Sequence, residues 1–160
     1  MLATMAMMLA IVVILSALES MLPPLPFAPP GIRLGLANVV SMYALLMMGK
    51  KQAIVLVVLK SAFVFISRGV FAGFLSASGG FFSLLLIVLL IVVYKNASYI
   101  AISVVGAMAF NFAQITVASI ILSTNILILY WPYIIIGGVV LGSITGKVLQ
   151  VVMPYFQKLR

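Results

Sequence analysis

The sequence has no cysteine, no histidine and no aspartate, and its single acidic residue is Glu19. These absences exclude several kinds of site. Cysteine or histidine ligands for zinc are lacking, as are the histidine of a catalytic triad and a pair of carboxylates for acid–base catalysis. We therefore expect no metal site, no cofactor and no enzyme activity in this chain.

Charge of either sign is scarce too. Only 6% of the 160 residues are charged, 66% are hydrophobic, and the mean hydropathy is +1.42. A soluble domain has about a quarter of its residues charged, so most of this chain must face lipid. At about 20 apolar residues per span, the length allows five or six helices. The predicted fold is an all-α integral membrane protein, a six-transmembrane-helix bundle in a single domain over residues 1–160.

Polar breaks between the apolar runs give the predicted boundaries. The spans are expected at about 3–18, 34–48, 52–67, 71–93, 98–122 and 126–153. Between the first two lies a loop at 20–31 that contains five prolines. Because proline at this density prevents a helix and stiffens the chain, we expect this loop to form a lid on the outer side.

The cations predict the orientation in the membrane. They lie singly or in pairs among apolar runs, which favours membrane interfaces and argues against binding to nucleic acid. If the N-terminus is inside, two cations, Arg33 and Arg68, fall outside, and five fall on the cytoplasmic side: Lys50, Lys51, Lys95, Lys158 and Arg160. The positive-inside rule therefore predicts a cell-membrane protein with both termini in the cytoplasm.

Polar side chains concentrate in the outer half of the predicted bundle. They are Glu19, Arg33, Asn38, Arg68, Ser76, Ser78, Asn111 and Gln114. Lys60 lies about 12 Å into its span; it either snorkels to the inner interface or faces the same site. Asn111 and Gln114 share a helix face, and either bond between helices or line a cavity. With Glu19 expected to neutralise Arg33 or Arg68, the predicted outward pocket is positive and suits a small anionic substrate, carboxylate or phosphate.

Small residues recur at four-residue spacing on three predicted helices. The pairs Ala6/Ala10 and Ala109/Ala113 and the trio Gly138/Gly142/Gly146 each place small side chains on one face. For the last two sets we expect packing within the bundle. The residues alone leave two alternatives for Ala6 and Ala10, which are internal packing and docking of another membrane protein.

Several segments resemble a known bacterial family. "LSALESMLPPLP", "PGIRLGLANVV", "GAMAFNFAQ" and the glycine-spaced last helix resemble the Gx transporters, a family also called heptaprenyl diphosphate synthase component I. That family is similar to the S components of energy-coupling factor (ECF) importers. The resemblance implies a six-helix fold, an outward ligand pocket, and contact of Ala6 and Ala10 with a transmembrane coupling subunit that works with ATPase subunits.

Two functions remain open at this point. The first is a substrate-binding subunit of an ECF-type importer that captures a small anionic vitamin-like or quinone- or isoprenoid-precursor-like compound; the sequence has no phosphate-binding loop of its own. The alternative is an accessory membrane subunit that binds a quinone or prenyl lipid in a redox or isoprenoid-biosynthesis assembly. The synthase name conflicts with the residues, because magnesium needs hard oxygen ligands and the chain has no aspartate.

Overall fold

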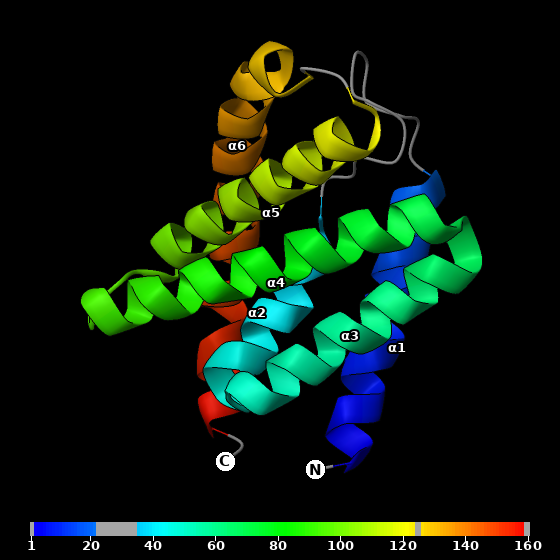
Figure 1. Cartoon of the computed structure of the whole chain (residues 1–160). Helices are drawn as coiled ribbons and strands as arrows, with labels where there is room; N and C mark the ends of the chain where they lie inside the picture. Colours follow the sequence, from blue (N-terminus) through cyan, green and yellow to red (C-terminus); the bar gives the residue numbers. More distant parts are fainter. Residues whose placement is uncertain (1, 22–34, 124–125, 159–160) are drawn as a thin grey trace.

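The computed structural model of the chain describes residues 2–21, 35–123 and 126–158. These ranges form six helices and no strand, which confirms the predicted all-α fold. The helices are α1 (Leu2–Met21), α2 (Asn38–Met47), α3 (Lys50–Arg68), α4 (Val70–Val93), α5 (Tyr99–Ile121) and α6 (Ile126–Lys158) (Figure 1). Of the predicted lid at 20–31, the first two residues belong to α1 and the rest lies outside the described residues.

The helices surround a short central one. Helices α3, α4, α5 and α6 form a row in which each helix packs against its neighbours in the chain (Figure 1). Helix α1 packs against α3, at the end of the row opposite α6. Helix α2 has only ten residues, about 15 Å of length, and it contacts each of the other five helices. The core is built around it: Ala37 and Ala44 of this region are fully buried, as are Val12 and Leu56 of its neighbours.

Glycine and serine mark the helix ends. Gly49 and Gly69 have φ angles of +103° and +88°, a conformation that glycine adopts without steric cost. They end one helix and begin the next, so that α3 and α4 follow their predecessors after sharp turns. At the start of α5 the Ser98 hydroxyl accepts a hydrogen bond of 3.1 Å from the backbone N–H of Ala101, as an N-cap does.

The glycine trio of α6 packs directly on the backbone of α5. A Cβ atom on Gly142 would lie 2.5 Å from the Cα of Val104, and one on Gly146 would lie 2.7 Å from the Cα of Ile100. No side chain fits at these distances, so the glycines allow the two helices to approach closely. Ala109 and Ala113 are also buried. These residues therefore pack within the bundle.

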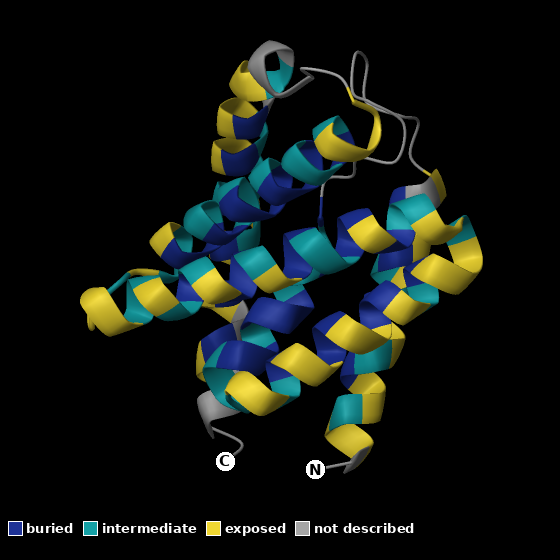
Figure 2. Cartoon of the chain, in the orientation of Figure 1, coloured by how far each residue is buried: buried dark blue, intermediate teal, exposed yellow. Residues whose placement is uncertain are grey.

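The outer surface of the bundle is apolar. Large hydrophobic side chains are exposed on every long helix, with Ile66 at 89% and Ile120 at 71%, and Figure 2 shows exposed residues along the outward faces of the helices. Among the described residues, three segments are long and apolar enough to cross a membrane: Val70–Val93, Tyr99–Ile121 and Tyr130–Val151. An apolar exterior of this extent suits lipid.

Candidate functional site

Polar side chains from four helices meet at one small cavity, which we call the Lys60 cavity. Its lining comprises Ser16 and Glu19 of α1, Lys60, Val64 and Arg68 of α3, Ala72 and Ser76 of α4, and Phe110 and Gln114 of α5. Its volume of about 20 Å³ holds one water-sized group. Glu19 and Arg68 stand in the last turns of their helices. The cavity therefore lies towards the end of the bundle opposite the start of α1 and the end of α6 (Figure 1).

Lys60 lies inside the bundle and does not extend to an interface. It is only 3% exposed, its ammonium donates a hydrogen bond of 2.6 Å to Oδ1 of Asn38, and its Nζ lies 5.1 Å from the centroid of the Phe110 ring. A lysine at the centre of a membrane helix costs about 2.5–3.5 kcal/mol on insertion scales. One neutral acceptor and one cation–π contact of about 0.5–2 kcal/mol compensate part of that cost.

The other two charged groups of the cavity, unlike Lys60, bond to backbone groups. The Glu19 carboxylate accepts a hydrogen bond from the N–H of Leu36, just before α2 begins. The Arg68 guanidinium donates to the carbonyl oxygen of Ser16. These two bonds connect α1 to the start of α2 and to the end of α3. Glu19 and Arg68 thus fix the relative positions of these elements as well as supplying charge.

Phe110 is the central residue of this region that the sequence did not single out. Its ring lies against two glycine backbones, because a Cβ on Gly79 would be 2.6 Å from a ring carbon and one on Gly35 would be 3.0 Å away. Gly35 also has a φ angle of +78°, which a residue with a side chain rarely adopts. The two glycines leave room for the aromatic ring beneath the Lys60 ammonium. A signal was present in the spacing, since Phe110 and Gln114 are four residues apart on one face of α5.

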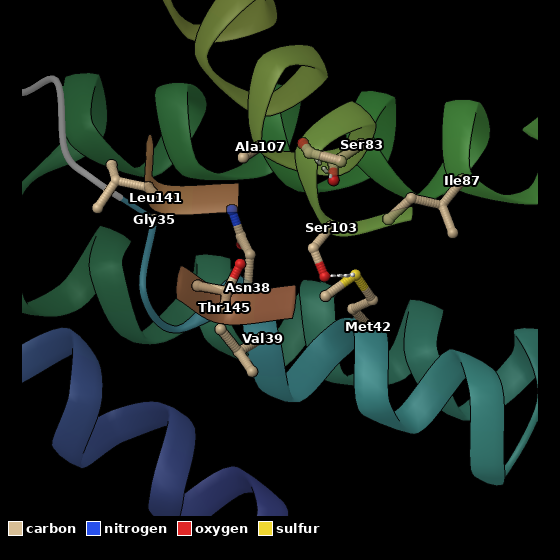
Figure 3. Close-up of a pocket in the computed structure, with 11 residues that line it drawn as sticks. Gly35, Asn38, Val39, Met42, Ser83, Ile87, Ser103, Ala107, Leu141 and Thr145 are labelled. Atoms are coloured by element: carbon tan, nitrogen blue, oxygen red, sulfur yellow. Dashed lines mark hydrogen bonds between the residues drawn. The ribbon is translucent and has the colours of Figure 1, made fainter. Parts of the chain in front are cut away.

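A second cavity of about 20 Å³ lies in the centre of the bundle, and we call it the central cavity. It is lined by Gly35, Asn38, Val39 and Met42, by Ser83 and Ile87, by Ser103, Gly106 and Ala107, and by Leu141 and Thr145 (Figure 3). The Ser83 hydroxyl donates to the carbonyl of Gly106 at 2.9 Å, and that of Ser103 lies 3.6 Å from the Met42 sulfur. Asn38 lines this cavity and bonds to Lys60, so it links the two cavities.

The remaining predicted site residues lie apart from the Lys60 cavity or outside the described chain. Asn111 is buried, but its amide nitrogen lies near Gly137 of α6. The Ser78 hydroxyl donates to the carbonyl of Leu75 one turn earlier in its own helix, at 3.1 Å. Arg33 lies outside the described residues. Of the nine predicted residues, the structure brings five to this cavity, namely Glu19, Lys60, Arg68, Ser76 and Gln114.

The small residues of α1 lie on the outside of the bundle. Ala6 and Ala10 are exposed, as are the larger side chains Met7, Ile11 and Ile14 beside them. Within the described chain α1 packs against α2 and α3 only. The alanine pair is therefore on the outer surface and not in the interior packing.

Residues 8–152 match the family described as heptaprenyl diphosphate synthase component I. The chain belongs to this family. No curated protein and no solved structure matches it. The family resemblance predicted from the sequence is thus confirmed, whereas the similarity to ECF S components stays a prediction.

The residues present do not fit the metal site that a prenyl diphosphate synthase needs. Magnesium is held by carboxylate and phosphate oxygens, but the sequence contains no aspartate and only one glutamate. One oxygen of that glutamate already accepts the N–H of Leu36. The chain therefore lacks the set of several carboxylates with which such a synthase holds a magnesium-bound diphosphate.

Proposed function

We propose that the chain is a substrate-binding membrane subunit, comparable to the S component of an ECF-type importer, that captures a small anionic compound from outside. The observation that carries this proposal is the Lys60 cavity, where two cations, one carboxylate and an uncharged amide meet inside an apolar bundle. Buried charges in a membrane protein mark ligand or ion sites more often than structural ones. The predicted orientation would place this cavity in the outer half.

A second support is the exposed face of α1 around Ala6 and Ala10. Small side chains on an outward helix face allow another helix to approach closely, as docking to a coupling subunit requires. In this proposal the chain performs no reaction itself, and ATP hydrolysis belongs to partner subunits. Lipid covers the rest of the apolar exterior.

The docking surface is tested by replacing both alanines with leucine. Ala6→Leu/Ala10→Leu should abolish co-purification of the chain with a transmembrane coupling subunit from the native membrane, because the added side chains block close helix approach. The matched control is Ala62→Leu, because Ala62 is also an exposed alanine but lies on α3. This variant should leave co-purification unchanged. Association that persists in the double variant contradicts the docking proposal.

The family description favours one other function. A component of a heptaprenyl diphosphate synthase assembly would be an accessory subunit that binds a quinone or a prenyl lipid. Native mass spectrometry of the protein purified in mild detergent distinguishes the two functions. A retained small polar anion agrees with the capture subunit, whereas a retained quinone or polyprenyl lipid agrees with the accessory subunit and contradicts the first proposal.

A further inference from the structure

The charges around the Lys60 cavity limit the kind of anion that fits there. Lys60 and Arg68 contribute two positive charges and Glu19 contributes one negative charge, so the described lining has a net charge of +1. Lys60 is fully enclosed within the bundle, where few water molecules are available to screen it. A ligand group with a single negative charge balances this lining, whereas a group with two or three charges would reverse its sign.

The hydrogen-bond donors at the cavity point to the same kind of group. The Ser76 hydroxyl lines the cavity, its residue is 6% exposed, and its oxygen has no hydrogen-bond partner in the described structure. A buried hydroxyl without a partner is unfavourable, so this one is available to a ligand. The Lys60 ammonium has three N–H groups, and one of them bonds Asn38. Hydroxyl and ammonium can therefore both donate to the oxygens of one acceptor.

Shape and charge separate carboxylates from phosphates at this cavity. Its free volume of about 20 Å³ is close to that of a single water site, which favours the smallest anionic group. A carboxylate is flat and presents two oxygens with one charge. A phosphate monoester is tetrahedral and carries about −1.5 to −2 charges at pH 7, and a diphosphate is larger and more highly charged.

We infer that the Lys60 cavity binds a carboxylate group of a monoanionic ligand and excludes phosphate and diphosphate. This inference rests on the proposed function, in which the same cavity receives the anionic part of the substrate. It also means that the ligand of this site is not the diphosphate named in the family's description. The Ser76 hydroxyl then differs between the two states of the cavity. It has no hydrogen-bond partner among the described residues when the cavity is empty, and it bonds to the ligand when the cavity is occupied.

The experiment measures the thermal unfolding midpoint of the full chain in neutral detergent at pH 7. Sodium acetate, inorganic phosphate and inorganic diphosphate are added at matched ionic strength, with sodium chloride as the reference. Acetate should raise the midpoint saturably above the chloride value, whereas the two phosphates should give only the gradual, non-saturating rise that excluded salts give any protein. The inference is overturned if phosphate or diphosphate gives a saturable rise at lower concentrations than acetate, or if acetate acts no differently from chloride.

A pair of serine variants assigns the acetate response to the cavity. Ser76→Ala should weaken the apparent acetate affinity by about tenfold, because it removes one hydrogen bond to a charged group. Ser41→Ala is the matched control: its hydroxyl is also buried without a partner, but it does not belong to the Lys60 cavity, and its response should equal that of the unmodified chain. An equal response of both variants contradicts the inference.

Failure of this inference is distinguishable from failure of the proposed function. If acetate has no effect but the Ala6/Ala10 variant loses its coupling subunit, the importer proposal stands and the ligand class is wrong. If acetate binds through Ser76 but the unmodified chain co-purifies with no transmembrane coupling subunit, the site stands and the importer proposal fails.

Discussion

At the scale of single residues, the contacts of Lys60 explain why two glycines lie near it. The ammonium bonds Asn38 and lies over the Phe110 ring. That ring fits only because Gly35 and Gly79 have no side chains. The position of one buried cation thus depends on two glycines that carry no charge and do not line the Lys60 cavity.

The substitution Gly79→Ala tests this dependence. Its Cβ would lie 2.6 Å from the Phe110 ring and 3.1 Å from the Gln114 side chain, so the ring must shift. We expect a loss of about 1–3 kcal/mol in the free energy of unfolding, as for other overpacked interiors, and a weaker acetate response. Both are measured by thermal unfolding with and without acetate.

Gly137→Ala is the control for this variant. A Cβ at that position approaches no atom closer than the Asn111 amide at 3.6 Å, which is an ordinary contact. Alanine also favours a helix over glycine by up to about 1 kcal/mol. The control should therefore be as stable as the unmodified protein or more stable, with an unchanged acetate response. A Gly79→Ala protein that behaved like this control would show that the Phe110 ring does not position Lys60.

At the scale of helices, the close contact between α5 and α6 depends on glycine. Gly142→Ala places a methyl group 2.5 Å from the Cα of Val104, and a backbone atom cannot move aside as a flexible side chain can. We expect the helices to separate and the unfolding midpoint in detergent to fall, with a loss of about 1–3 kcal/mol. Ser143→Ala, the next residue along the helix and only half-buried, should change the midpoint little. A midpoint for Gly142→Ala equal to that of Ser143→Ala would contradict the packing described for α6.

The helices were the part of the structure that the sequence predicted best. Helix α4, at Val70–Val93, lies within one residue of the predicted 71–93, because long apolar runs and glycine breaks are local signals. The rotation of each helix is not local. Asn111 and Gln114 share a face by spacing, yet Gln114 lines the Lys60 cavity and Asn111 lies against α6.

The reason is geometric. Residues three apart differ by about 60° around a helix axis, and residues four apart by about 40°, so the partner of Gln114 at the cavity is Phe110. Whether one side of a helix faces a cavity or a neighbouring helix depends on how all the helices pack together. For the same reason, the bond between Lys60 and Asn38 could not be read from two residues that are 22 positions apart.

At the scale of the whole molecule, the orientation in the membrane remains a prediction that can be tested directly. The chain contains no cysteine, so a single introduced cysteine can be labelled without background. Lys95→Cys, in the turn between α4 and α5, should react with a membrane-impermeant maleimide only after permeabilisation. Ser123→Cys, in the turn after α5, should react in intact cells. The reverse pattern would place the Lys60 cavity on the cytoplasmic side and would contradict capture from outside.

The length of α2 has a consequence for how the protein enters the membrane. With ten residues and about 15 Å of length, it covers half of the roughly 30 Å hydrocarbon core, so it cannot remain there as an independent span. Its stability must come from the five helices that surround it, four of which are synthesised after it. The ribosome therefore releases the central element of this bundle before four of the five helices that pack against it have been synthesised.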